Sequence, residues 1–112
     1  MAWHSLESLS ELEQLVGSSQ KNDNTVAIFK HSTRCAISSM AKSRLEKSWQ
    51  KVNADIPIYI LNLIEHRDIS DKIAEHFNVP HQSPQLILVK SGNAVYNASH
   101  ISISSKAAAK YI

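Results

Sequence analysis

The sequence contains very little cysteine and glycine, and both shortages limit the chemistry it can perform. Its 112 residues include one cysteine, Cys35, so any disulfide chemistry must take its second sulfur from another molecule. A lone cysteine also agrees with a reducing compartment. The two glycines, Gly17 and Gly92, lie too far apart for a phosphate-binding loop or a dinucleotide fingerprint, which disfavours nucleotide-binding enzymes.

A strong charge of one sign and long apolar runs are missing as well. Lys and Arg number 12 against 10 Asp and Glu, without a basic cluster, so we expect no nucleic-acid partner. No run of about 18 apolar residues occurs, and residues 1–9 lack the features of a secretory signal. We therefore expect a cytoplasmic protein with no membrane partner. The length and the 43% hydrophobic content fit one domain, residues 1–112.

The N-terminal part of the chain predicts one short helix followed by a loop. Leucine and valine side chains recur there at helical spacing, Ser8 and Glu11 are placed as a capping box, and Gly17 suits a left-handed C-cap. The polar residues 18–24 have nothing to bury. We expect them to form a loop that leads into the first strand.

Apolar and β-branched runs predict the strands of a central sheet. They lie near residues 25–30, 58–63, 85–90 and 94–98. The first two are separated by a helical segment, so they form a βαβ unit with parallel strands. The last two surround a tight turn that contains Gly92 and form an antiparallel hairpin.

Three further helical segments complete the predicted order. The strongest follows the first strand, and its apolar stripe consists of Ile37, Met40, Ala41, Leu45, Trp49 and Val52. The next begins at Asp68 or Ser70, either of which can cap it, and stops at Asn78. The Ala-rich tail predicts a closing helix from about Ser102. The order α-βαβ-α-ββ-α predicts an α/β fold with one mixed, four-stranded sheet and helices on both faces.

Cys35 is the strongest candidate for chemistry because it lies between the first predicted strand and the strongest helix. Unpaired backbone N–H groups and the helix dipole favour a thiolate there, and Arg34 and His31 can add positive charge. The residues alone leave two interpretations open, a reactive thiol and a buried, inert cysteine.

Ser38 stands where a dithiol redox motif has its second cysteine. Its hydroxyl can donate a hydrogen bond to the Cys35 thiolate, although the pattern alone favours an ordinary first-turn serine. Pro84 stands immediately before a predicted strand, where its missing N–H is tolerated. A cis Ser83-Pro84 bond would let the backbone of Ser83 pair with an extended substrate, whereas a trans proline that ends a loop is the commoner arrangement.

Six histidines raise the question of a metal site. Two pairs have spacings that zinc could use, His31 with Cys35 and His76 with His81. However, the sequence offers only one thiolate, and the two pairs lie on different predicted elements. We therefore expect no metal. A Cys–His hydrolase is disfavoured further, because the chain is small for a substrate cleft.

The stretch FKHSTRCAISSMA, residues 29–41, resembles the active-site segment of the monothiol bacilliredoxins, the YtxJ-like bacillithiol-system proteins. Family members usually carry Cys-Pro-Ile-Ser, and Ala36 stands here in place of the proline. The length and the order of the predicted elements also fit the family. The resemblance covers nearly the whole chain and implies a thioredoxin-like fold.

The resemblance implies thiol–disulfide exchange with bacillithiol, a small thiol that some Gram-positive bacteria use in place of glutathione. Cys35 would attack the bacillithiol sulfur of a bacillithiolated client protein and would be regenerated by free bacillithiol or a separate reductase system. Bacillithiol would be a co-substrate, and no cofactor would be bound. Catalytic roles fall to Cys35 and Ser38. The substrate-binding residues implied are Thr33, Arg34, Ala36, Ser83 and Pro84, with Ser83-Pro84 cis and beside Cys35.

Two other functions remain open. One is an iron–sulfur carrier of the monothiol glutaredoxin kind, although the Gly-rich active loop and the Gly-Gly pair typical of such carriers are missing from the sequence. The other is a redox-inert adaptor with the thioredoxin fold, in which the cysteine is incidental. The adaptor hypothesis predicts a buried, slowly reacting thiol.

Overall fold

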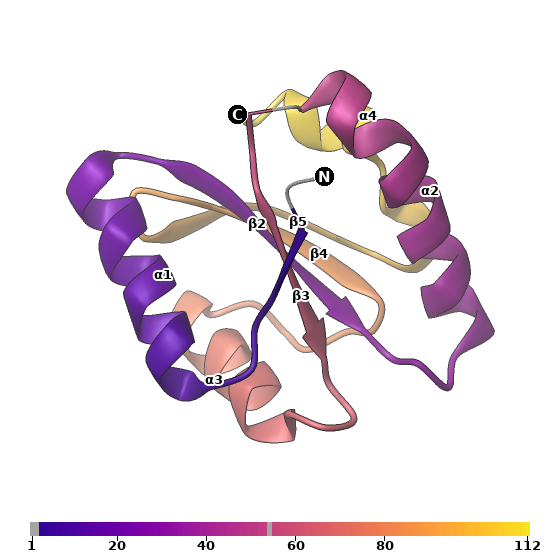
Figure 1. Cartoon of the computed structure of the whole chain (residues 1–112), viewed down its shortest axis with the longest axis horizontal. Coiled ribbons are helices and arrows are strands. Elements are labelled where there is room, and N and C mark those ends of the chain that lie inside the picture. Colours follow the sequence, from indigo (N-terminus) through magenta and orange to yellow (C-terminus); the bar gives the residue numbers. More distant parts are fainter. Residues whose placement is uncertain (1–2, 54) are drawn as a thin grey trace.

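The protein is built around one five-stranded mixed sheet in a computed structural model that describes residues 3–53 and 55–112 (Figure 1). The strands are β1 (Trp3–Ser5), β2 (Thr25–His31), β3 (Ile58–Asn62), β4 (Gln85–Lys90) and β5 (Asn93–Ser99). Their order across the sheet is β1-β3-β2-β4-β5. β3 is parallel to both β1 and β2, whereas β4 is antiparallel to both β2 and β5. The predicted βαβ unit and hairpin are confirmed.

The prediction of four strands is wrong by one, because the sheet gains β1 at its edge. Trp3 of this strand pairs with Ile58 of β3, and just after β1 the N–H of Leu6 donates to the carbonyl of Ile60 at 2.9 Å. A strand of three residues is too short to show an alternating pattern. Its conformation depends on hydrogen bonds to β3, which local sequence does not reveal.

The part of the chain that the structure describes contains four α-helices, arranged on both faces of the sheet (Figure 1). They are α1 (Leu9–Asn22), α2 (Ala36–Val52), α3 (Arg67–Phe77) and α4 (Ser105–Ala109), with a short 3-10 helix at His100–Ser102. The side chains of β2 alternate between two cores. Val26 and Ile28 pack in the core under α1 and α3, whereas Ala27 and Phe29 pack in the core under α2 and α4. None of the described helices is long and apolar enough to cross a membrane.

The first helix is longer than predicted. Ser8 caps its start as expected, since its hydroxyl accepts a hydrogen bond from the N–H of Glu11 at 3.1 Å. The helix then continues past Gly17 and ends at Asp23, whose φ of 54° forms a left-handed C-cap. The expected loop after Gly17 is wrong because Ser19 is buried and bonds to the backbone before β2 and in the β4–β5 turn.

The ends of the later helices are partly as predicted. The predicted stop at Asn78 is confirmed, and this residue forms a left-handed C-cap with φ of 55°. Neither Asp68 nor Ser70 caps the start of α3, because the N-cap is His66, which makes no side-chain cap bond. The last helix begins after Ser104, whose hydroxyl accepts from the N–H of Ala107.

The buried face of α2 differs from the predicted apolar stripe. It consists of Ser38, Ala41, Leu45 and Trp49. Ile37 and Met40 are instead exposed at 49% and 66%, and Val52 is exposed as well. The helix is turned so that the Ser38 hydroxyl reaches polar groups at the end of β2, and this pairing displaces Ile37 and Met40 into solvent.

Candidate active site

Cys35 is the N-cap residue of α2, as the sequence predicts. Its N–H donates to the carbonyl of Ser32 at 3.2 Å, and its own carbonyl accepts from Ser39 at 3.0 Å. The residue is half-buried, and its side chain makes no capping hydrogen bond. The thiol therefore lies outside the closed core and next to the free N–H groups of a helix start, where a negative charge is stabilised.

Ser38 lies one turn into α2 and is fully buried against the end of β2. Its oxygen accepts from the N–H of Ser32 at 3.0 Å and lies 2.7 Å from Nδ1 of His31. The donor in this contact depends on the tautomer of His31: the hydroxyl donates to an unprotonated Nδ1, and a protonated Nδ1 donates to the hydroxyl oxygen. The described hydrogen bonds of Ser38 therefore orient His31 and Ser32, and the expected bond to the Cys35 sulfur is not formed.

His31 is buried at the end of β2, and its ring stacks on Phe29 with centroids 5.8 Å apart. Burial lowers the pKa of His31 below its ordinary value of 6.5, and the positive charge of Lys42 lowers it further against the opposing charge of Glu46. The imidazole is neutral at pH 7. The expectation that His31 adds positive charge beside the thiol is therefore wrong at this pH.

The predicted cis Ser83-Pro84 bond is confirmed. The next residue, Gln85, pairs with Lys30 across the sheet, so the proline lies at the end of the sheet where β2 finishes. The carbonyl of Pro84 accepts from the N–H of His100 at 3.1 Å. The Ser83 hydroxyl is buried without a hydrogen-bond partner among residues 3–53 and 55–112. The proline segment and the Cys35 loop thus extend from the same end of the sheet.

The three other predicted substrate-binding residues flank Cys35 in the loop and first turn. Thr33, Arg34 and Ala36 are all exposed. Beside this loop is a pocket of about 430 Å³, whose lining includes His31, Thr33, Lys42, Asn62, Glu65 and His66. The surroundings of Cys35 are therefore open to solvent on the side of this loop. Among the described residues, no three His, Cys, Asp or Glu side chains are grouped closely enough to hold a metal ion.

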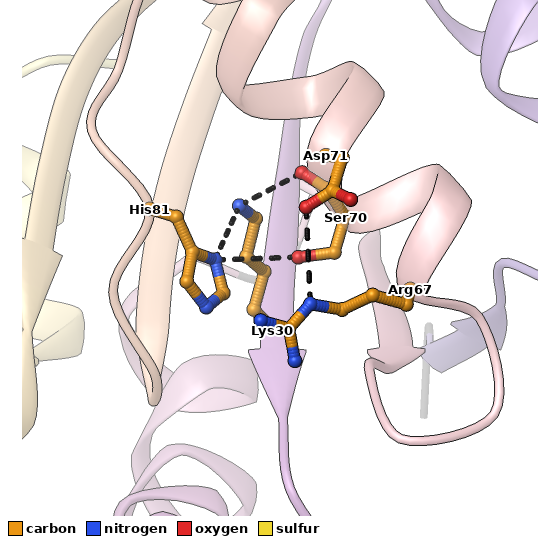
Figure 2. Close-up of polar contacts among 5 residues, drawn as sticks. All are labelled: Lys30, Arg67, Ser70, Asp71 and His81. Atoms are coloured by element: carbon orange, nitrogen blue, oxygen red, sulfur yellow. Dashed lines mark hydrogen bonds and ion pairs between the residues drawn. The ribbon is translucent and has the colours of Figure 1, made fainter.

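A second polar cluster near this end of the sheet was not predicted. Lys30 is completely buried, and its Nζ donates to the carbonyl of Ser70 at 3.2 Å and to Nδ1 of His81 at 3.3 Å (Figure 2). The Ser70 hydroxyl also lies 3.3 Å from Nδ1 of His81. Burial lowers the pKa of Lys30 from 10.5 to about 8, with Asp71 raising it and Arg67 lowering it. The available signal was a lysine inside a run expected to be a core strand.

The chain matches known proteins over almost its whole length. The family model described as "Monothiol bacilliredoxin BrxC" matches residues 4–108. A solved structure described as a candidate oxidoreductase with a thioredoxin fold shares 33% identity, covers 97% of this chain and 94% of its own, and gives a TM-score of 0.82.

More distant structures agree on the fold. Thioredoxin from Malassezia sympodialis is 19% identical, with a TM-score of 0.77 and coverage of 98% of this chain and 92% of its own. Thioredoxin from Fasciola hepatica is 12% identical, with a TM-score of 0.72 and coverage of 96% and 93%. These two likenesses concern the fold alone, which is the thioredoxin fold.

Proposed function

The chain belongs to the monothiol bacilliredoxin family, and from this membership we propose that it removes bacillithiol from protein mixed disulfides through Cys35. Family and fold make it a thiol oxidoreductase. The observation that supports the finer proposal is the position of its sole cysteine, half-buried at the N-cap of α2. Because the chain has no second cysteine, the mixed disulfide formed on Cys35 cannot be resolved within the chain.

The proposed reaction is an exchange of sulfur partners without net oxidation. The Cys35 thiolate attacks the bacillithiol sulfur of the client mixed disulfide, and a new disulfide forms between Cys35 and bacillithiol. The bond between the client sulfur and bacillithiol breaks, and the client thiolate takes a proton from solvent. A second thiolate, from free bacillithiol or a separate reductase system, then attacks the bacillithiol sulfur and releases the Cys35 thiolate.

The site residues have distinct tasks in this proposal. The helix start stabilises the attacking and leaving thiolate of Cys35. The exposed residues Thr33 and Arg34 contact the substrate beside it, and the Ser83-Pro84 segment faces the client from the same end of the sheet. The partners of the protein would be bacillithiolated client proteins. We place the reaction in the cytoplasm, since a lone cysteine suits a reducing compartment.

Intact-mass measurement tests the proposal directly. Wild-type protein and the Cys35→Ser variant are incubated with oxidised bacillithiol and, in parallel, with oxidised glutathione. We expect a bacillithiol adduct on the wild-type protein only, and we expect it to form faster than the glutathione adduct. Wild type should also take up bacillithiol from a bacillithiolated model client. Equal rates with both disulfides would contradict bacillithiol specificity. A coloured, iron-containing dimer after reconstitution would support the iron–sulfur carrier instead, and an unreactive thiol would support the adaptor.

A further inference from the structure

The hydrogen-bond acceptors around the buried Lys30 ammonium do not require it as a donor. Its two partners each have another hydrogen bond available: the Ser70 carbonyl lies within α3 and accepts there from Ala74, and Nδ1 of His81 has the Ser70 hydroxyl at 3.3 Å. Removing the amine would therefore leave neither group unsatisfied. Hydrogen-bond satisfaction does not explain why a lysine occupies this position.

The electrostatic setting of Lys30 is also unfavourable. A buried ammonium needs a close carboxylate to offset its desolvation, and no described carboxylate makes a hydrogen bond or ion pair with it. Asp71 is exposed. Its carboxylate pairs with Nε of Arg67 at 3.8 Å (Figure 2). The titratable groups around Lys30 are these two side chains of α3 and His81 from the segment before β4, while β4 contributes the neutral Gln85. Lys30 thus occupies its position at a cost in stability.

The contacts of Lys30 join the end of β2 to the segment that carries the cis proline. His81 receives the bond from Lys30, and the carbonyl of Pro80 receives a bond at 3.1 Å from the side chain of Gln85, the residue that pairs with Lys30 in the sheet. The start of the segment from Pro80 to Pro84 is therefore held at two successive residues. Its other end enters β4 directly.

We propose that Lys30 is a positioning residue for the exchange reaction, which through His81 holds the Ser83-Pro84 segment in place at the end of the sheet where Cys35 begins α2. This inference rests on the proposed function of Cys35. A client polypeptide must align with the segment for its sulfur to reach Cys35, and a loose segment has to be ordered at each binding event. A small disulfide has no polypeptide to align. Lys30 should therefore matter for protein clients and not for small disulfides.

Lys30→Met tests the proposal, with Lys90→Met as the matched control, an exposed strand lysine at the opposite end of β4. Toward a bacillithiolated model protein we expect Lys30→Met to lower kcat/KM roughly tenfold, mainly by raising KM. The rate with oxidised bacillithiol should stay at the wild-type value, and Tm should not fall. His81→Ala should have the same effect, and the double variant should be no worse than either single one, because both act through one contact.

Hydrogen exchange provides a readout that does not depend on activity. The backbone amide of His100, which donates to the Pro84 carbonyl at 3.1 Å, should exchange faster in Lys30→Met, while the amides of β2 and β4 stay protected. If wild type fails to react with bacillithiol, the proposed function fails, and the His100 amide still decides whether Lys30 positions the segment. If Lys30→Met does not fold, the exchange of the same amide in His81→Ala decides. Unchanged amide exchange together with unchanged kcat/KM in Lys30→Met would overturn the inference. A variant in which Tm, the rate with the protein client and the rate with oxidised bacillithiol all fall would overturn it as well.

Discussion

Replacing Lys30 with methionine should stabilise the protein at neutral pH, with a pH dependence that identifies the buried charge as the cause. The pKa of Lys30 is lowered by burial from 10.5 to about 8. A tenfold change in proton affinity corresponds to about 1.4 kcal/mol, so holding the proton in the folded state costs about 3 kcal/mol. Methionine has a similar length and no charge, although it loses the two hydrogen bonds of the amine. We therefore expect a gain of about 1–3 kcal/mol at pH 7.

The sign follows from proton binding in the two states. Below pH 8, Lys30 is protonated in both the folded and the unfolded protein, and the folded state carries the full cost. Between about 8 and 10.5 the unfolded chain keeps a proton that the folded protein has lost, so the stability of wild type rises with pH. The Lys30→Met variant lacks this rise. Its advantage should therefore shrink by about 1.4 kcal/mol for each pH unit in that interval.

Urea unfolding of both proteins at pH 7, 8, 9 and 10 measures this difference. Subtracting the two unfolding free energies at each pH removes the contributions that both proteins share and leaves the effect of Lys30. The slope of unfolding free energy against urea should be the same for both, as required for a comparison of stabilities. A variant that is less stable than wild type at pH 7, or an advantage that does not change with pH, would refute the assignment of Lys30 as a costly buried charge.

Other substitutions test the site and the backbone. Cys35→Ser should abolish removal of bacillithiol from a model client, whereas Ser38→Ala should only weaken this removal. Ser38→Ala should also lower the unfolding free energy by about 1–3 kcal/mol, because the buried imidazole of His31 loses its partner. Equal kinetic losses in the two variants would show that the role of Ser38 is mis-assigned. Gly17→Ala should stabilise by about 0.5–1 kcal/mol, because the residue lies within α1 with open space around it. Gly92→Ala should destabilise by about 1 kcal/mol or more, because φ is 80° and the new methyl would overlap Gln20; shifts in Tm of the same sign for both glycine variants would contradict this account.

Local patterns in the sequence determined the class of the fold and the place of the nucleophile. Periodicity and capping depend on residues a few positions apart, so the runs that form β2 to β5 and the C-cap at Asn78 could be recognised without tertiary information. The same local signals put Cys35 at the start of α2. The cis state of Ser83-Pro84 required the family resemblance, since the dipeptide by itself favours a trans bond.

Only the tertiary structure decided which polar groups are buried and what they bind. Ser38 turns α2 toward the end of β2 through its bond to His31, and this rotation leaves Met40 in solvent against the apolar pattern. Lys30 meets Ser70 and His81, which are 40 and 51 positions away in the sequence. A hydrophobic pattern shows which side chains of a helix or strand can face a core. The burial of a polar side chain depends instead on hydrogen-bond partners from distant segments, and these come into reach only after the sheet and helices have packed.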